Sequence, residues 1–195
     1  LIKQKYPDKL LISGGGHARW NAEKFLNKGF EIVATSEAEE TIKEIIQEYR
    51  KGTNDWSNIR QIMFNKDGEI IDNSSGGRVV MNLDELPFPD WEIKRGHGVA
   101  WDDKEVVKWA SVMTSLGCPF KCTYCHLSKE FEGSLTGNIG RHRIKSEERV
   151  MEELLYLKNE VGIKQIFIED DAIFGRKKRA IKILEDKVSL NGYRI

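Results

Sequence analysis

All three cysteines of this 195-residue chain lie in one short stretch, SLGCPFKCTYCH, which spans residues 115–126. Cys118, Cys122 and Cys125 have the spacing C-x-x-x-C-x-x-C, and His126 follows the last of them directly. Thiolates are soft ligands that suit zinc, copper(I) or iron–sulfur clusters. The two cysteines separated by two residues can chelate one metal centre, and the third can close over the same centre. The stretch is therefore predicted to be a metal site.

Two kinds of metal centre suit this ligand set. Structural zinc normally has four protein ligands; because His126 is adjacent to Cys125 and badly placed to share the ion, His142 would be the fourth. A four-iron cluster bound by three thiolates would leave one iron open to a substrate or cofactor. Residues 122–126 also match the C-x-x-C-H pattern of covalent haem attachment, which the third cysteine and the missing export signal disfavour. Unliganded thiols are the remaining alternative.

The elements around the cysteines predict an α/β arrangement. Residues 106–116 (VVKWASVMTSL) are a predicted strand that leads into the cysteine stretch, and residues 163–168 (IKQIFI) are a second strand. Between them, Ser146 is expected to cap a helix that Gly162 ends, since two glutamates in its first turn suit the positive end of the helix dipole. The cysteines then follow the C-terminal end of the first strand, where α/β barrels carry their chemistry.

The first half of the chain also alternates strands and helices. Residues 9–13 (KLLIS) and 30–35 (FEIVAT) are predicted strands, and a short polar helix is expected near residues 21–27. Apolar residues recur at i, i+3, i+4 and i+7 over residues 42–49, which predicts an amphipathic helix. The Asn-Lys-Asp-Gly stretch at residues 65–68 predicts the turn of a hairpin. This alternation implies a parallel sheet with crossover helices.

An extended segment divides the chain. Residues 83–92, LDELPFPDWE, carry two prolines that favour extended backbone. We predict domains over residues 1–82 and 106–195, joined by a linker over residues 83–105. Because the sequence begins at Leu1 with the expected tail of a helix and stops soon after another helix, we expect it to be a fragment of a larger α/β protein.

The cysteine stretch resembles the signature of the radical S-adenosylmethionine (SAM) superfamily. The resemblance lies in the cysteine spacing, in the aromatic Tyr124 before the last cysteine and in the position after a first strand. It implies that Cys118, Cys122 and Cys125 ligate a [4Fe–4S] cluster whose fourth iron is chelated by SAM. It also implies that an electron from the reduced cluster cleaves SAM into methionine and a 5′-deoxyadenosyl radical, while the protein places the cofactors and excludes water.

The same resemblance implies further contacts with SAM. Tyr124 is expected near the adenine, and Phe120 is expected to shield the cluster. In the family, the end of the second strand helps to bind the amino group of SAM, often through Gly-Gly-Glu, and this chain has Glu169-Asp170-Asp171 there instead. Acidic groups suit a positive ammonium, so Glu169 and Asp170 are the expected SAM-binding residues. A solvated acidic loop before the next helix is the alternative.

The first half resembles the cobalamin (B12)-binding domain of class B radical SAM methyltransferases and their relatives. In that Rossmann-like domain a strand ends in Gly-Gly, which maps to Gly14, Gly15 and Gly16, and these glycines are the expected cobalamin contacts. Residues 86–91, Leu-Pro-Phe-Pro-Asp-Trp, match the connection between the family's domains. A Gly-Glu-Gly-Glu stretch of the family is Ser-Glu-Ala-Glu at residues 36–39 here, with both glycines replaced.

The implied fold is a partial Rossmann-like B12-binding domain followed by the first βα units of a radical SAM TIM-type barrel. The glycine stretch has a plain turn as its alternative. A dinucleotide-binding fingerprint is disfavoured, because it needs a glycine where Arg19 stands. His17 is expected to be a loop histidine and not a ligand of cobalt.

The implied function is that of a radical SAM enzyme that cleaves SAM reductively. It would either methylate an unactivated carbon through methylcobalamin or catalyse another radical transformation. An enzyme without a functional cobalamin site and a non-catalytic zinc-binding module are the alternatives. The expected partners are a small-molecule substrate, whose identity does not follow from the sequence, and an electron donor such as flavodoxin or ferredoxin.

The composition argues against other classes of partner. Lys plus Arg and Asp plus Glu both number 31, so the net charge is zero, and nothing global attracts nucleic acid or a membrane surface. No apolar run approaches the ~18 residues of a membrane span. Three clustered cysteines make a poor disulfide framework. A reducing cytoplasm is therefore the expected location.

Overall fold

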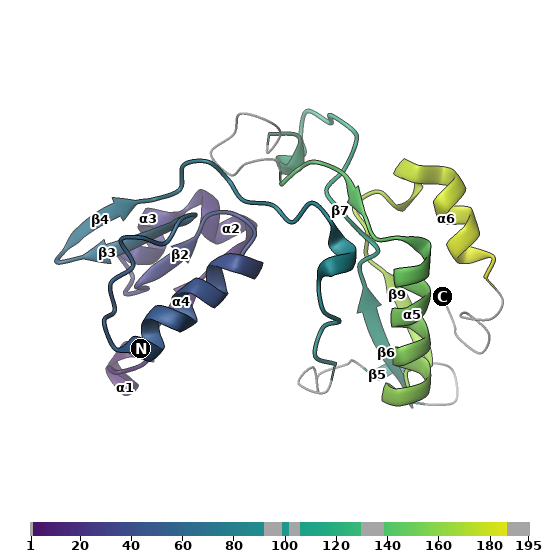
Figure 1. Cartoon of the computed structure of the whole chain (residues 1–195), viewed down its shortest axis with the longest axis horizontal. Coiled ribbons are helices and arrows are strands. Elements are labelled where there is room, and N and C mark those ends of the chain that lie inside the picture. Colours follow the sequence, from purple (N-terminus) through teal and green to yellow (C-terminus); the bar gives the residue numbers. More distant parts are fainter. Residues whose placement is uncertain (1, 92–98, 102–105, 130–138, 187–195) are drawn as a thin grey trace. The chain divides into compact units, whose positions relative to one another are not determined.

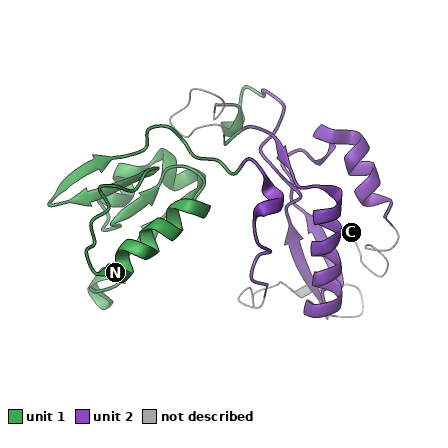
Figure 2. Cartoon of the chain, viewed as in Figure 1, with its two compact units in different colours: residues 1–80, 122–140 green, residues 81–121, 141–195 purple. Residues whose placement is uncertain are grey.

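The computed structural model describes residues 2–91, 99–101, 106–129 and 139–186. The chain forms two compact units (Figures 1 and 2), residues 1–80 with 122–140 and residues 81–121 with 141–195. Two stretches of the predicted linker, residues 92–98 and 102–105, lie outside the described residues. None of the helices in the described part is long and apolar enough to cross a membrane.

The first unit is built on a four-stranded sheet with the order β1-β2-β3-β4. Its strands are β1 (Ile12–Ser13), β2 (Ile32–Ala34), β3 (Ile62–Lys66) and β4 (Glu69–Asp72). β1 and β2 are parallel neighbours, as predicted, whereas β3 runs antiparallel to β2. β3 and β4 form the predicted hairpin. Asp67 and Gly68 have φ values of 53° and 90°, as the two central residues of a type I′ turn require.

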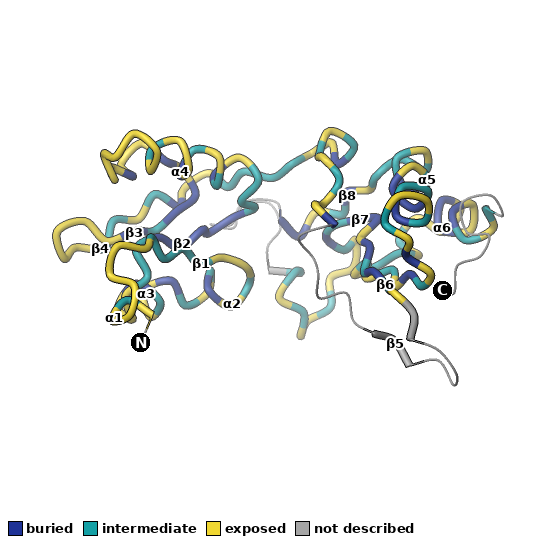
Figure 3. Tube along the Cα trace, turned by 90° about the horizontal axis from the view of Figure 1, so that it is seen from below, coloured by how far each residue is buried: buried dark blue, intermediate teal, exposed yellow. Residues whose placement is uncertain are grey.

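Helices pack on both faces of this sheet. They are α2 (Gly15–Trp20), α3 (Ala22–Leu26) and α4 (Glu39–Lys51), preceded by the short α1 (Ile2–Lys5). Side chains of a strand point alternately to the two faces, so Ile32 of β2 packs in one cluster with Ile45 of α4, and Val33 packs in another with Leu26 of α3. β2 is buried along its length (Figure 3). α4 is the predicted amphipathic helix, and it ends before Gly52.

The second unit centres on two parallel strands, β6 and β9. Its elements are η1 (Leu83–Glu85), β5 (Val99–Trp101), β6 (Val106–Val112), β7 (Ser115–Leu116), β8 (Arg143–Ile144), α5 (Glu147–Tyr156), η3 (Leu157–Val161), β9 (Gln165–Ile168), η4 (Ile173–Arg176) and α6 (Lys177–Leu184). The two βα units, β6 with α5 and β9 with α6, are those predicted. The antiparallel pairing of β5 with β6 and the small β7–β8 ribbon were not predicted. Ser146 caps α5 by accepting a hydrogen bond from the backbone of Arg149 at 3.0 Å.

The two helices bury one face of the β6–β9 sheet. Ile166 of β9 packs in one core cluster with Leu154 of α5 and Ile183 of α6. The other face carries Trp109 and Phe167, whose rings meet edge to face with centroids 5.3 Å apart. Phe167 is 43% exposed. The helices therefore cover one face of this sheet and form its core. The loops at the C-terminal ends of the strands are attached to that core.

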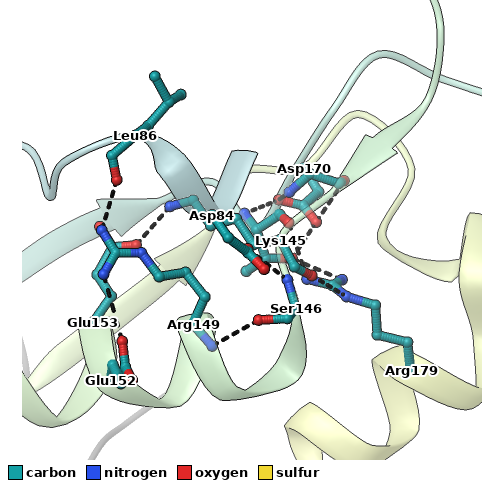
Figure 4. A network of polar contacts seen from close by, with 11 residues as sticks. Asp84, Leu86, Lys145, Ser146, Arg149, Glu152, Glu153, Asp170 and Arg179 are labelled. Carbon is teal, nitrogen blue, oxygen red and sulfur yellow. Dashed lines mark hydrogen bonds and ion pairs between the residues drawn. The ribbon is translucent and has the colours of Figure 1, made fainter. Parts of the chain in front are cut away.

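The described start of the predicted linker is packed on α5 (Figure 4). Asp84 accepts a hydrogen bond from the backbone N–H of Ser146 at 2.8 Å. Arg149 donates to the carbonyl of Leu86 at 2.6 Å, and its Cζ lies 3.8 Å from the centre of the Phe88 ring. This segment therefore belongs to the second unit, while the predicted domain boundaries at residues 82 and 105 stay predictions.

Candidate functional site

The first cysteine follows a left-handed turn after β7. Gly117 has a φ of 73°, which favours glycine, and it leads directly into Cys118, a half-buried free thiol. The next residue, Pro119, is in close contact with η4: a Cβ atom at position 175 would lie 3.0 Å from Pro119 and 2.9 Å from His142. Because Gly175 has no side chain, η4 can approach the start of the cysteine stretch.

Cys122 and Cys125 lie in a tight turn of the first unit. The backbone N–H of Cys125 donates to the carbonyl of Cys122 at 3.1 Å. The hydroxyl of Ser128 lies 2.8 Å from that carbonyl oxygen and 2.7 Å from the carbonyl oxygen of Cys125. Ser128 belongs to a short 3₁₀ helix, η2 (His126–Lys129), whose first residue is exposed. These hydrogen bonds hold the backbone of the C-x-x-C turn.

The donor chemistry of the three cysteines fits an iron–sulfur cluster. All three are free and half-buried, and three thiolates are a ligand set that leaves one iron of a four-iron cluster open. Cys118 belongs to the second unit, and Cys122 and Cys125 belong to the first. In the described ranges, no group of three His, Cys, Asp or Glu side chains is arranged to hold a metal ion. The assignment of the cysteines as ligands stays a prediction.

Two aromatic side chains of the cysteine stretch are strongly exposed. Tyr124 is 90% exposed and Phe120 is 59% exposed. The pKa of Tyr124 is raised above its usual value, first by a side-chain hydrogen bond with Cys122 and then by the negative charge of that thiolate. Both rings are therefore accessible to a bound molecule, as their predicted contact with SAM requires.

A buried polar network joins the end of β9 to the start of β7 (Figure 4). Asp170 accepts hydrogen bonds from the backbone N–H groups of Thr114 and Ser115 at 2.5 and 3.0 Å, and from their hydroxyls at 2.6 and 2.8 Å. Arg179 of α6 donates to the hydroxyl and the carbonyl of Thr114 at 3.1 and 2.9 Å, and to the carbonyl of Lys145 at 2.9 Å. Burial lowers the pKa of Arg179, and the charge of Asp170 opposes that shift.

The two acids that were predicted to bind SAM lie in different surroundings. Glu169 is exposed, and its backbone N–H donates to the carbonyl of Val112 at 3.0 Å. Asp170 is half-buried, and its carboxylate is engaged in the four hydrogen bonds above. Asp171 is exposed. The acidic stretch thus contains one carboxylate held inside the protein between two that face solvent.

His142, the fourth ligand in the zinc alternative, carries a buried nitrogen. Its Nε2 has no hydrogen-bond partner in the described part of the chain. The pKa of His142 is lowered, first by burial and then by the positive charge of Arg176. The imidazole is therefore favoured in its neutral form, which can accept a hydrogen bond or bind a metal ion.

A cavity of about 540 Å³ lies in the first unit, where β1 and β2 end. Its lining is mainly apolar and consists of Ile12, Ser13, Gly14, Ala34, Ala38, Glu39, Ile42 and Ile45. The carboxyl ends of parallel strands are the usual ligand site of an open α/β sheet. Of the three predicted cobalamin contacts, Gly14 lines this cavity, whereas Gly15 and Gly16 form the first turn of α2 and do not line it.

The lining of the cavity includes the carboxylate of Glu39, and within the described part of the chain one of its oxygens is free to accept a hydrogen bond. Glu39 Oε2 is buried and has no hydrogen-bond partner in the described residues. Glu39 is the first residue of α4, where the helix dipole favours a negative charge. The hydroxyls of Thr35 and Thr41 nearby in the sequence are also buried and unpartnered. Because buried polar groups normally have partners and cobalamin carries peripheral amides, the cavity fits one edge of that cofactor.

Residues 36–39, which replace the family's Gly-Glu-Gly-Glu stretch, have two different roles in the structure. The hydroxyl of Ser36 donates to the carbonyl of Arg78 at 2.6 Å, and Glu37 accepts a hydrogen bond from the backbone N–H of Val80 at 2.8 Å. These two residues hold the segment that follows the hairpin. Ala38 and Glu39, by contrast, line the cavity.

Sequence reasoning missed Thr114, Ser115 and Arg179. The partners of their side chains lie 34 to 65 positions away in the chain, so no local spacing relates them. Two adjacent hydroxyl residues shortly before Cys118 were the available local sign. Small hydroxyl residues are so common near strand ends that this sign alone predicts nothing.

Comparison with known proteins finds similar proteins among methyltransferases and radical SAM enzymes. No family model matches the sequence. An uncharacterized methyltransferase of Pyrococcus horikoshii is 32% identical over 175 residues, 89% of this chain and 36% of that protein. The anaerobic magnesium-protoporphyrin IX monomethyl ester cyclase of Cereibacter sphaeroides is 22% identical over 187 residues, 94% of this chain and 29% of that protein. The chain thus spans about a third of the length of these relatives.

Solved structures share the fold along nearly the whole chain. The cobalamin-dependent SAM radical enzyme OxsB, solved with aqua-cobalamin and SAM bound, matches with a TM-score of 0.64 and 20% identity over 90% of this chain and 24% of its own. The radical SAM methyltransferase TsrM of Kitasatospora setae, solved with cobalamin and a [4Fe–4S] cluster, matches with a TM-score of 0.61 and 16% identity over 91% of this chain and 33% of its own. The chain therefore has a mixed α/β fold similar to the matching parts of these two enzymes. The resemblance to the cobalamin-binding subgroup of radical SAM enzymes, predicted from the cysteine stretch and the first half, is confirmed.

Proposed function

We propose that this chain binds a [4Fe–4S] cluster through Cys118, Cys122 and Cys125 and serves in a radical SAM enzyme. The observation that carries the proposal is three free, half-buried thiols in one short stretch of chain, the first of which, Cys118, follows β6 and β7 of the second unit. Methyltransferase and cyclase relatives along nearly the whole chain support it.

SAM is the second cofactor of the proposed site. With a reduced cluster it supplies reductive cleavage of its sulfonium, which starts radical chemistry. Phe120 and Tyr124 offer exposed rings to the adenine and the cluster. Glu169 and Asp170 place negative charge at the end of β9, and the exposed Glu169 is the acid available to pair with the ammonium of SAM.

Cobalamin is the proposed third cofactor, held in the first unit. Gly14 would let it approach the cavity at the ends of β1 and β2, Gly15, whose φ is 80°, would allow the turn beside it, and Glu39 would accept a hydrogen bond from one of its amides. The proposed reaction is methylation of a carbon through methylcobalamin or another radical transformation of a small molecule, with flavodoxin or ferredoxin as the electron donor.

An enzyme without a functional cobalamin site is the second candidate. It is favoured by the two glycines of the family that are Ser36 and Ala38 here, because Ser36 is engaged in holding the carbonyl of Arg78. A structural zinc site that includes His142 is the non-catalytic candidate.

Anaerobic reconstitution with iron and sulfide tests the cluster. The wild-type chain is expected to retain about four irons and the absorbance of an iron–sulfur cluster, and the Cys118→Ala, Cys122→Ala and Cys125→Ala variants are each expected to lose both while their circular dichroism stays that of wild type. His126→Ala is the matched control and is expected to retain the cluster. Bound zinc without cluster absorbance, or cluster retention in the cysteine variants, would contradict the proposal.

Retention of hydroxocobalamin separates the first candidate from the second. After gel filtration, the wild-type chain is expected to keep the colour of the cofactor in a one-to-one ratio. A reconstituted chain that keeps its cluster but no cobalamin would favour the second candidate.

A further inference from the structure

We propose that Asp170 and Arg179 are positioning residues for the cysteine stretch, which act by holding Thr114 and Ser115 where β6 leads into β7. This proposal rests on the proposed cluster site, since it concerns how the first cluster ligand is held. It gives Asp170 a role other than direct contact with SAM.

The carboxylate of Asp170 is fully engaged. A carboxylate offers about four acceptor positions, and Asp170 accepts two backbone and two hydroxyl hydrogen bonds, all between 2.5 and 3.0 Å. The donors are buried, with Thr114 0% and Ser115 2% exposed. No acceptor position of Asp170 is left to face an ammonium group, and the neighbouring Glu169 is exposed.

Arg179 makes the remaining side-chain hydrogen bonds to Thr114. Its guanidinium donates to the hydroxyl and to the carbonyl of Thr114, and that carbonyl also accepts from the backbone N–H of Lys145 at 2.9 Å. The Thr114 hydroxyl therefore accepts from Arg179 and donates to Asp170 at once. One buried hydroxyl links a cation and an anion, so its loss removes one hydrogen bond from each of two charged groups inside the protein, which keep only their other partners.

The network acts at the base of the cysteine stretch. Ser115 and Leu116 pair with β8, and Gly117 alone separates this pairing from Cys118. Outer groups that orient a metal ligand normally affect how strongly the metal is held. The network therefore sets where the backbone enters the stretch, and thereby where the Cys118 thiolate lies.

Thr114→Val tests the proposal, because valine has the shape of threonine without the hydroxyl. Thr114→Ser is the conservative variant that keeps the hydroxyl. The full chain is reconstituted anaerobically, and two quantities are measured: the rate at which a ferrous chelator removes iron, and the EPR spectrum of the reduced cluster with and without SAM. Thr114→Val is expected to release iron about tenfold faster than wild type with an altered spectrum, and Thr114→Ser is expected to behave as wild type.

A control variant distinguishes an effect on the position of Cys118 from a general loss of stability of the second unit. Ile183→Val removes a methyl group from the buried core of the same unit and leaves every hydrogen-bonding group of the network in place, and is expected to lower the melting temperature while iron release and the EPR spectrum stay those of wild type. Asp170→Asn keeps the size of the side chain and is a second test should Thr114→Val fail to fold; it is expected to accelerate iron release in the same direction.

The outcomes distinguish this proposal from the proposed function. If wild type assembles a cluster and Thr114→Val and Asp170→Asn release iron at the wild-type rate, or Ile183→Val accelerates release as much, the positioning role is refuted and the cluster assignment stands. If wild type assembles no cluster, the proposed function fails and this proposal fails with it.

Discussion

The carboxylate of Asp170 accepts two hydrogen bonds from Thr114, one from the backbone N–H at 2.5 Å and one from the hydroxyl at 2.6 Å, although 56 positions separate the two residues in the chain. The contact joins the loop after β9 to the segment between β6 and β7. It closes a long loop of chain at one buried point, where Arg179 also donates a hydrogen bond to the hydroxyl of Thr114. The segment that precedes the cysteines is therefore anchored by tertiary contacts.

Asp170→Asn is expected to destabilise the second unit by about 2–4 kcal/mol. The amide removes the largest favourable charge interaction of Arg179 and presents an N–H group to donors where an acceptor is needed. Urea unfolding followed by circular dichroism measures the change. Asp171→Asn is the matched control, because Asp171 is exposed, and its effect is expected to stay within about 0.5 kcal/mol. Equal effects of the two substitutions would contradict the role given to Asp170.

Arg149→Lys is expected to loosen residues 83–91 from α5. Lysine cannot both donate to the carbonyl of Leu86 and lie flat over Phe88, as the guanidinium does. The loss is expected to be about 1 kcal/mol. It should appear as roughly fivefold faster hydrogen exchange of the amides in residues 83–91, at constant protection of β6. Arg141→Lys, at an exposed position, should leave the exchange unchanged; unchanged exchange in Arg149→Lys as well would refute the attachment.

His142 is expected to make the second unit less stable as the pH falls through the range in which an unfolded histidine titrates, about 6.5. Because burial and Arg176 lower the pKa of His142 in the folded state, the unfolded state binds the proton more readily, and stability rises with pH across that window. The stabilising contribution is complete above the unfolded pKa and is lost as the pH drops toward the folded pKa. Melting temperatures of wild type and His142→Gln, compared at about pH 7.5 and about pH 5.5, should show a smaller drop in the variant. An equal drop in both proteins would show that His142 is not the titrating group.

Gly14→Val is expected to reduce cobalamin retention without affecting the cluster. A Cβ atom at position 14 would lie 3.5 Å from the Cβ of Ala34, an ordinary contact, so the substitution is compatible with the backbone while its branches enter the cavity. A loss of about tenfold in affinity, or about 1.4 kcal/mol, is expected in a titration with hydroxocobalamin. Gly16→Ala is the control, because position 16 does not line the cavity. Wild-type affinity in Gly14→Val would exclude this cavity as the binding site.

Several elements could be predicted because neighbours in the sequence determine them. The Asp67-Gly68 turn needs two positive φ values that glycine and aspartate tolerate. The cap at Ser146 uses a backbone N–H three positions later, and α4 follows from an apolar period of one helical turn. The C-x-x-C turn is likewise local, since Cys125 bonds back to Cys122.

Other features escaped prediction for an equally physical reason. The β7–β8 ribbon pairs Ser115 with Ile144, and strands of two residues have no periodicity to detect. Residues 83–91 have an extended composition, yet Asp84 and Phe88 find partners on α5 through contacts about sixty positions away. Composition predicts that such a segment is extended, but it cannot predict which surface it lies on.

By itself, the sequence determined what the cysteine stretch can ligate and what surrounds it locally, because thiol spacing, turn residues and helix periods depend on covalent geometry and near neighbours. The tertiary structure alone decided that Asp170 serves Thr114 and Ser115, that Gly14 and Glu39 share one cavity while Gly16 does not, and that Arg179 reaches the base of the cysteine stretch. These outcomes depend on which buried polar groups find partners when distant strands are brought together, and that pairing exists only in the folded chain.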